Sequence, residues 1–162
     1  MTEFENFLSP GRKGHLIGIG GVSMSSLAEV LNGMGLSITG SDMNESSNVL
    51  NLRKKGIPVV IGHNAENITD DVEFVVRTAA VHDENPEIQA AHVKGIPVFE
   101  RTQAWGAISK DYDNALCICG THGKTTTTSM CTHIMMAADK DPTVMIGGTL
   151  PLLKAGHRVG HG

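Results

Sequence analysis

The sequence lacks long hydrophobic runs and a basic leader. No apolar segment approaches the roughly 18 to 20 residues of a membrane-spanning helix. The N-terminal stretch MTEFENFLSPGRKG is acidic and polar, whereas a signal peptide is basic and then apolar. These absences predict a cytoplasmic protein with no membrane partner.

Positive charge and cysteine are also scarce. Thirteen Lys and Arg face seventeen Asp and Glu, a net charge of -4, and no basic block is available to neutralise a row of nucleic-acid phosphates. Nucleic acid is therefore not an expected partner. Three cysteines are an odd number, which excludes a complete disulfide framework and fits a reducing compartment. Cys117 and Cys119 lie two apart in an expected strand, and we predict that both pack in a core.

Short apolar segments alternate with helical stretches along the chain. Twice, in the repeated segment Lys-Gly-Ile-Pro-Val, a helix is expected to end on a glycine and pass directly into a strand. This alternation predicts an α/β fold, a Rossmann-like doubly wound parallel sheet. The expected strands are 15–19, 36–40, 57–61, 74–76 and the second Ile-Pro-Val segment, 96–98, and the expected helices are 23–32, 48–55 and 87–94.

A polar stretch at 109–114 predicts a boundary between two domains, 1–112 and 113–162. The second part is expected to contain a strand at 115–119, a helix at 124–138 and a strand at 142–146, followed by a tail rich in Gly and His. Roughly 50 residues bury too little surface for a stable domain. We therefore expect the truncated start of a larger domain.

The helix expected in the second part carries an apolar stripe that we predict to be core. Its members are Met130, Ile134, Met135 and Ala138.

The first glycine-rich loop, Gly18-Ile19-Gly20-Gly21-Val22-Ser23, follows one expected strand and opens a helix. Glycines at such a corner let phosphates approach the backbone, and a helix start offers unpaired N–H groups. Asp42, 22 residues after Gly20, ends the next strand, where an acidic residue meets a ribose hydroxyl. An alternative is a tight turn with a helix-capping Asp. The candidate nucleotide-binding residues are Gly18, Gly20, Gly21, Val22, Ser23 and Asp42.

The second glycine-rich loop has the chemistry of a shortened P-loop. Lys124 can reach terminal phosphates, and the Thr125 hydroxyl can ligate Mg2+. Four consecutive threonines, 125–128, are poor helix formers, so a helix that begins with them suggests hydroxyls kept for a ligand. The candidate ATP-binding residues are Gly120, Thr121, His122, Gly123, Lys124, Thr125 and Thr126, with the role of His122 open.

Two phosphate loops on successive domains imply two nucleotides, or one nucleotide and a nucleotide-linked substrate. This combination resembles the Mur ligases. The resemblance runs along essentially the whole chain. The segments that carry it are HLIGIGGVSMSSLAEVL (15–31), TGSD (39–42), GH (62–63), NPE (85–87), GTHGKTTTTSM (120–130) and DPTVMIGG (141–148).

The resemblance is nearest to the branch of the family that joins L-alanine to UDP-N-acetylmuramate. It implies that ATP, with Mg2+, phosphorylates the lactyl carboxylate and that the amine of L-alanine attacks the acyl phosphate. Lys124 and Thr125 are the implied catalytic residues. Family members continue for several hundred residues beyond this region, so we expect these 162 residues alone to form no amide bond.

The resemblance also implies a pocket for the UDP-sugar. The loop 18–23 would hold its diphosphate, Asp42 would meet the uridine, and His63 would line the same pocket. The family's usual Ser-Ser-Ala-Ile is here Thr78-Ala79-Ala80-Val81, so we expect Thr78 and Ala79 to contribute to the pocket through the backbone. Ser23 replaces the family's glycine in the first loop.

Three other functions stay open. A ligase that recycles murein peptide shares the His-containing loop and differs in its acceptor. The first domain alone also fits a dinucleotide-binding oxidoreductase module, and the whole chain fits a non-catalytic nucleotide-binding module. No pattern in the sequence sets an oligomeric state.

Overall fold

The structure is a computed structural model that describes residues 3–110 and 112–160. Its chain forms two compact units, Met1–Asp113 and Asn114–Gly162. We call these the N-terminal unit and the C-terminal unit and describe each by itself.

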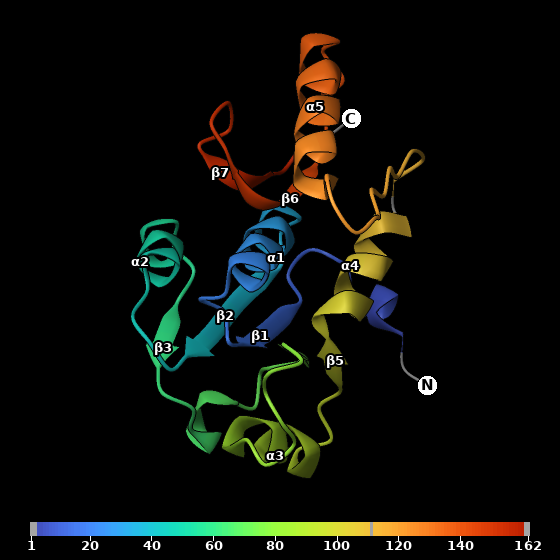
Figure 1. The fold of residues 1–162 in the computed structure, drawn as a ribbon. Coiled ribbons are helices and arrows are strands. Elements are labelled where there is room, and N and C mark those ends of the chain that lie inside the picture. The colour runs from blue at the N-terminus through green and yellow to red at the C-terminus, as the bar shows by residue number, and fades with distance from the viewer. Residues whose placement is uncertain (1–2, 111, 161–162) are drawn as a thin grey trace. The chain divides into compact units, whose positions relative to one another are not determined.

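The N-terminal unit is built on a parallel sheet of five strands in the order β3-β2-β1-β4-β5 (Figure 1). Every neighbouring pair is parallel, with Leu16 of β1 opposite Gly40 of β2 and Val76 of β4. The Rossmann-like α/β fold predicted from the sequence is therefore confirmed. The strands are β1 Lys13–Ile17, β2 Ser37–Asp42, β3 Val59–Ile61, β4 Phe74–Arg77 and β5 Val98–Glu100.

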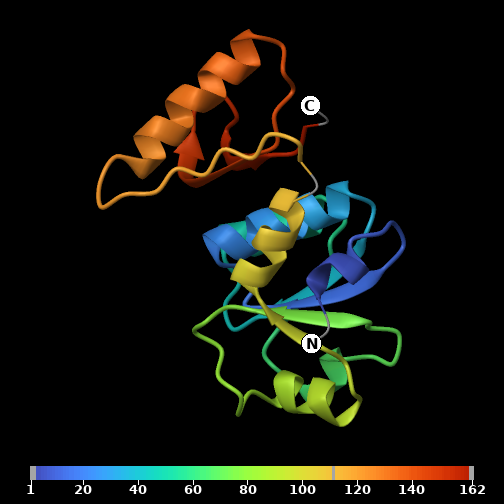
Figure 2. The ribbon, with the colours of Figure 1, turned by 90° about the vertical axis from the view of Figure 1, so that its right-hand side faces the viewer.

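Helices cover both faces of this sheet, and α1 and α4 lie on the opposite face from α3 (Figure 2). The start of α3 follows from its sequence, because the Asn85 side chain accepts a hydrogen bond from the Glu87 amide and Pro86 occupies the first turn, as predicted. The α-helices are α1 Val22–Gly33, α2 Ser47–Lys54, α3 Pro86–Val93 and α4 Arg101–Lys110, and the 3-10 helices are η1 Phe4–Phe7 and η2 Ala65–Asn67.

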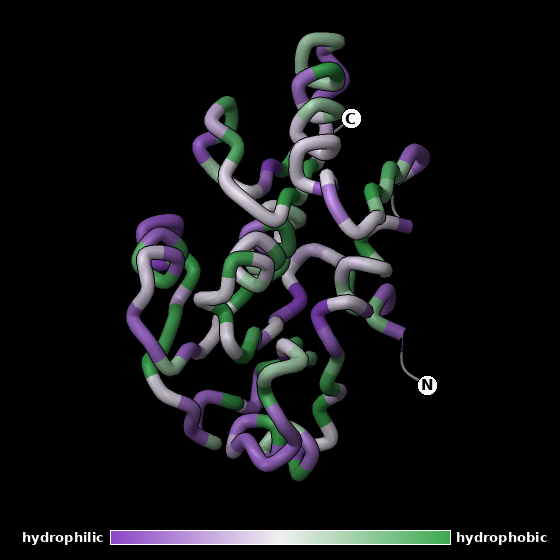
Figure 3. The backbone as a smooth tube through the Cα atoms, in the orientation of Figure 1, coloured by the Kyte–Doolittle hydropathy of each residue, from purple (hydrophilic) through white to green (hydrophobic). Residues whose placement is uncertain are grey.

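The core of the N-terminal unit follows from the apolar strands, which alternate with hydrophilic segments along the chain (Figure 3). Leu16, Val75 and Val76 are fully buried, as parallel strands covered on both faces require. Phe4 of η1 packs edge-on against Phe74, with ring centroids 5.2 Å apart. This aromatic contact brings the N-terminal segment onto the sheet, an element that the sequence analysis did not predict.

The C-terminal unit contains one helix and one antiparallel strand pair. Helix α5, Lys124–Ala137, begins at the predicted residue. Strand β6, Val144–Leu150, pairs with β7, Ala155–Arg158, which lies in the tail where no strand was predicted.

The strand predicted at 115–119 is wrong, because the structure gives this segment no strand. Leu116 keeps 63% of its surface exposed, and Cys117 and Cys119 are exposed, so their predicted packing in a core is wrong as well. A buried parallel strand requires neighbouring strands and helices on both faces. The described part of the C-terminal unit offers only the β6–β7 pair, whose strands bond to each other.

The predicted apolar stripe of α5 is not core in this chain. Met130 and Ile134 keep 60% and 66% of their surfaces exposed, and Met135 keeps 40%. The helix packs mainly against β6, which is too small to cover this face. Among residues 3–110 and 112–160, no helix combines the length and apolar character needed to cross a membrane.

Candidate functional site

The N-terminal unit has its topological switch point between β1 and β4. These neighbouring strands lead into connections that run to opposite sides, and parallel sheets of this kind bind ligands at the carboxyl ends of the strands there. Gly18 follows β1 and Thr78 follows β4. A Cβ on Gly18 would lie 3.4 Å from Thr78 Cγ2, which is ordinary van der Waals contact, but the φ of Gly18, +78°, is one that a side chain disfavours, so the turn favours glycine.

Most amides of the first glycine loop are engaged within the fold. The N–H groups of Gly18 and Ile19 donate to the carbonyl oxygen of Ser41 at 2.8 and 3.0 Å. The Gly21 N–H donates to the Gly18 carbonyl oxygen at 3.2 Å. These three amides hold the loop and are not free for a ligand.

The start of α1 is where the loop leaves amides unpaired. Gly21 is the N-cap and makes no side-chain cap, and the first amides of a helix, here those of Val22 and Ser23, have no intrahelical acceptor. Ser25 and Ser26 turn their hydroxyls back to the Val22 carbonyl oxygen, both at 2.9 Å. Within the predicted diphosphate-binding loop, the unpaired amides therefore lie at the helical end.

Asp42, the last residue of β2, closes the glycine loop. Its Oδ2 accepts the Gly20 N–H at 2.8 Å, and its Oδ1 accepts the Asn44 N–H at 3.0 Å. A Cβ on Gly20 would lie 2.8 Å from Asp42 Oδ2, so the bond depends on glycine. These bonds form the tight turn that the alternative interpretation of the sequence predicted. The side chain is half-buried, and each carboxylate oxygen keeps a further lone pair.

His63 lies just beyond β3 and is held by a buried carboxylate. Its Nδ1 is 2.9 Å from Glu87 Oε2 and 3.1 Å from Ser41 Oγ. Asn67 of η2 donates to Glu87 Oε1 at 2.6 Å and to the Gly62 carbonyl oxygen at 3.2 Å. Glu87 itself has no exposed surface, so it joins α3, β2 and the segment after β3 from inside the unit.

His15 extends this buried cluster along the sheet. Its Nδ1 is 2.9 Å from Thr39 Oγ1, and its Nε2 faces Glu87 Oε1 at 3.5 Å without a closer partner. Burial raises the pKa of Glu87, but the proximity of the His15 ring and the hydrogen bonds from Ser41 and Asn67 outweigh it and lower the pKa below its ordinary value.

Sequence reasoning assigned no role to Glu87 or Ser41, although both stand in the segments that carry the family resemblance. A signal for the cluster was present. Thr39 and Ser41 are two apart in a buried strand, and Thr39 lies opposite His15 in the register of the sheet, so these polar side chains share one face.

Thr78 and Ala79 form a turn after β4. The Thr78 hydroxyl accepts the Ala80 N–H at 3.2 Å, and its carbonyl oxygen accepts the Val81 N–H at 3.1 Å. Thr78 is half-buried and Ala79 is exposed. The Thr78 hydroxyl therefore shapes its own turn, beside Gly18 at the switch point.

The second glycine loop gives α5 an open N-terminus. Gly123 is the N-cap, with φ of +79° and no side-chain cap, so the first amides of the helix are unpaired. Lys124 Nζ donates to the carbonyl oxygens of Gly120 at 2.5 Å and Thr121 at 3.3 Å. The ammonium group thus lies against its own loop. His122 is exposed.

The threonines of α5 differ in what their hydroxyls do. Thr128 and Thr132 donate to the carbonyl oxygens of the residues four positions earlier, Lys124 and Thr128, each at 2.8 Å. Among the described residues, Thr125 and Thr126 have no side-chain partner, and both are exposed. The first two hydroxyls of the run are therefore free for a ligand.

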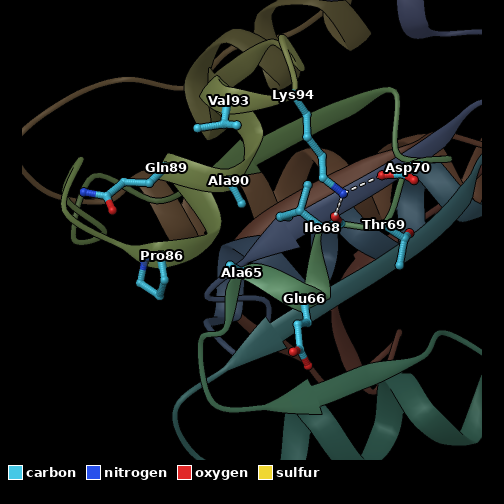
Figure 4. Close-up of a pocket in the computed structure, with 10 residues that line it drawn as sticks. All are labelled: Ala65, Glu66, Ile68, Thr69, Asp70, Pro86, Gln89, Ala90, Val93 and Lys94. Atoms are coloured by element: carbon cyan, nitrogen blue, oxygen red, sulfur yellow. Dashed lines mark hydrogen bonds and ion pairs between the residues drawn. The ribbon is translucent and has the colours of Figure 1, made fainter.

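A hollow of about 770 Å³ on the surface of the N-terminal unit holds none of the predicted site residues (Figure 4). It lies between η2 and α3, and Lys94 spans part of it to bond with the Ile68 carbonyl oxygen and Asp70. The residues that line it are Ala65, Glu66, Ile68, Thr69, Asp70, Pro86, Gln89, Ala90, Val93 and Lys94.

The switch-point corner and the parallel sheet define a Rossmann-like α/β protein. The family described as Mur ligase family, catalytic domain, matches residues 13–113. The chain belongs to this family.

Curated relatives carry the name UDP-N-acetylmuramate--L-alanine ligase. The relative from Agathobacter rectalis is 49% identical over 146 residues, which are 90% of this chain and 32% of that protein. The relative from Clostridium novyi is 45% identical over 157 residues, 96% of this chain and 34% of that protein. The chain therefore spans about a third of the length of the curated relatives that it matches.

Solved structures of ligases are also similar to this chain. The UDP-N-acetylmuramate-alanine ligase MurC from Thermotoga maritima has a TM-score of 0.85 and 35% identity, over 91% of this chain and 35% of that one. A murein peptide ligase from Psychrobacter arcticus has a TM-score of 0.84 and 26% identity, over 93% of this chain and 34% of that one.

Proposed function

We propose that this chain supplies the UDP-sugar-binding part and the phosphate loop of a ligase that joins L-alanine to UDP-N-acetylmuramate in peptidoglycan synthesis. The observation that carries the proposal is the pair of uncapped helix starts after glycine turns, at Gly21 in the N-terminal unit and Gly123 in the C-terminal unit. Each offers unpaired amides to an anion. Relatives named for this reaction share 45% to 49% identity with the chain.

In the N-terminal unit, the amides of Val22 and Ser23 bind the diphosphate of UDP-N-acetylmuramate. Asp42 and His63 lie at the ends of the neighbouring strands and meet the uridine, with Thr78 and Ala79 at the switch point on the other side. Asp42 contributes through lone pairs that its bonds to Gly20 and Asn44 leave free.

In the C-terminal unit, the loop from Gly120 to Thr126 fits the phosphates of ATP. Its two glycines have φ of +148° and +79°, and no side chain caps the helix. Lys124 turns from the loop carbonyls to the terminal phosphates, and the free hydroxyl of Thr125 holds Mg2+. ATP supplies the phosphoryl group that activates the substrate carboxylate for attack by the amine of L-alanine.

Isothermal titration of this chain with UDP-N-acetylmuramate tests the first part of the proposal. We expect binding of UDP-N-acetylmuramate and no binding of NADH, because the resemblance is to ligases and not to oxidoreductases. Binding of NADH alone would overturn the assignment. We also expect no L-alanine-dependent ADP release from these 162 residues, and detectable release would contradict that expectation.

The murein peptide ligase is the second candidate, since its fold likeness is nearly as high as that of the alanine ligase. The two differ in the acceptor. Comparing L-alanine with a murein tripeptide as acceptor in a longer protein that contains this chain separates them.

A further inference from the structure

The core beneath α3 contains buried polar side chains, although apolar side chains would be enough to stabilise the fold there. Glu87 is completely buried, and His15 and Ser41 are at most 1% exposed. Removing a carboxylate from water costs several kcal/mol, and apolar residues at buried ionic sites are often as stabilising. Stability alone therefore does not account for this cluster. Its role lies in the side chain that it positions.

The hydrogen-bond geometry fixes the proton on His63. The lowered pKa of Glu87 keeps its carboxylate ionised at neutral pH, so both oxygens only accept. Ser41 donates its one hydroxyl proton to Glu87 Oε2 at 2.7 Å. Neither Glu87 nor Ser41 then has a proton for His63 Nδ1, which lies 2.9 and 3.1 Å from them. Nδ1 must itself carry the proton and donate to both.

The same contacts determine where the other ring nitrogen is free. A neutral imidazole protonated on Nδ1 has a lone pair on Nε2. His63 Nε2 has no partner among the described residues, and 14% of the side chain is exposed. In its neutral form the ring is thus an acceptor on its open side.

The backbone places this acceptor beside the proposed uridine site. The Gly62 N–H donates to the Asp42 carbonyl oxygen at 2.8 Å, and Asn67 holds the Gly62 carbonyl oxygen while it also donates to Glu87. His63 is therefore tied to the residue that closes the glycine loop.

We propose that Glu87 is a positioning residue that holds His63 as the Nδ1-protonated tautomer, so that Nε2 accepts a hydrogen bond from the uridine of the substrate. This inference rests on the proposed function. The donor on uridine is its imide N–H or a ribose hydroxyl, and 3-methyluridine monophosphate against 2',3'-dideoxyuridine monophosphate distinguishes the two.

The first test is nitrogen-15 NMR of the histidine rings in the 162-residue chain without ligand. We expect His63 to be protonated on Nδ1 and bare on Nε2 at neutral pH. A ring with Nε2 protonated, alone or together with Nδ1, overturns the proposal. This measurement needs no variant and no substrate, so its result is independent of the proposed function.

The second test is Glu87→Gln, which keeps the size of the side chain and supplies an amide that can donate to Nδ1. We expect the His63 signal to lose its Nδ1-protonated form and the Kd for UDP-N-acetylmuramate and for UMP to rise about tenfold, the effect of one hydrogen bond. Glu66→Gln is the matched control, because Glu66 is exposed on η2 and outside the cluster. We expect it to change neither quantity.

His63→Ala separates positioning from packing. We expect it to raise the Kd by about the same factor, and we expect the double variant with Glu87→Gln to raise the Kd no further, because both changes remove one interaction. Losses that multiply, or variants that bind like the wild type, overturn the proposal. Absence of UDP-N-acetylmuramate and UMP binding by the wild-type chain would instead overturn the proposed function.

Discussion

Asp42 Oδ2 accepts the amide hydrogen of Gly20 at 2.8 Å, so the end of β2 closes the turn that opens α1. The two residues are 22 apart in the sequence, and their bond joins a strand end to a helix start. Asp42 thereby has a structural role in the same corner where we propose that it meets the uridine.

We predict that Asp42→Ala lowers the free energy of unfolding by about 1 to 3 kcal/mol, because two amides lose a charged acceptor. Asp42→Asn keeps one carbonyl oxygen and is expected to lose less. Urea denaturation followed by circular dichroism measures both, and titration with UDP-N-acetylmuramate shows whether affinity falls with them.

Asp70→Ala is the control for this pair. Asp70 is exposed and forms a surface ion pair with Lys94, which contributes at most about 1 kcal/mol. An Asp42 variant no less stable than the Asp70 variant would contradict the structural role.

Substitution by alanine at two glycines of the N-terminal unit is expected to change the free energy of unfolding in opposite directions. A Cβ on Gly14 would lie 2.2 Å from the Phe74 ring, which is fully buried and packed against Phe4, so the ring has no room to move. Gly14→Ala is expected to destabilise by about 1 to 3 kcal/mol or more. Gly106, inside α4, has nothing within 4 Å of its Cβ position, and Gly106→Ala is expected to stabilise by about 0.5 to 1 kcal/mol.

Urea unfolding of the two variants under one set of conditions measures this difference. Equal stability would show that the close contact between β1 and the aromatic ring is wrong.

Local signals in the sequence predicted the elements that depend on local chemistry. Asn85 and Pro86 set the start of α3, and Lys124 is the first residue of α5, as the glycine loop before it indicated. The alternation of short apolar segments with helical stretches predicted the parallel sheet, because strands that are covered on both faces are apolar throughout.

Features that depend on distant partners were not predictable in the same way. Ser41 and Glu87 are 46 residues apart, and no local pattern pairs them. The segment 115–119 has the composition of a strand, but strand formation also requires neighbours, and the described part of the C-terminal unit provides none for it. Phe4 was missed for the same reason, since its burial depends on Phe74.

For the candidate site, the sequence predicted where both glycine-rich loops lie, but not which acceptors their amides bond. Gly18 and Gly20 were predicted to face phosphates, whereas their N–H groups bond to Ser41 and Asp42. Such internal bonds depend on how β2 lies beside β1, which the sequence of the loop does not state.

Lys124→Ala is expected to weaken ATP binding by about ten- to a hundredfold, the effect of losing a charge-assisted hydrogen bond. The affinity for UMP should stay unchanged, because the lysine belongs to the other loop. Titration of the chain with Mg-ATP and with UMP measures both. In a longer protein that contains this chain, the same change is expected to abolish turnover.

Lys140→Ala is the control, since Lys140 is exposed and lies beyond the end of α5. Equal losses of ATP and UMP affinity in Lys124→Ala would show that the loop is assigned wrongly.

The pH dependence of stability offers a separate view of Glu87. Its pKa is lowered in the folded protein, so the folded state binds the proton less tightly than the unfolded chain, whose value is near 4.5. The stabilisation is therefore fully present above that pH and is lost as the pH falls through the folded-state pKa. Wild type should exceed Glu87→Gln by about 1 to 3 kcal/mol at pH 7, and the gap should narrow below pH 4.5.

Urea denaturation of both proteins between about pH 3 and pH 7 measures this gap, and using the difference removes the contribution of the other acids. Asp71, whose pKa is lowered to about 2 by hydrogen bonds with Lys13 and Thr69, titrates identically in the two proteins. A gap that widens on acidification would mean that Glu87 is held in its protonated form. In that case the carboxyl group is able to donate a proton to His63, and the lone pair assigned to Nε2 no longer follows from the contacts.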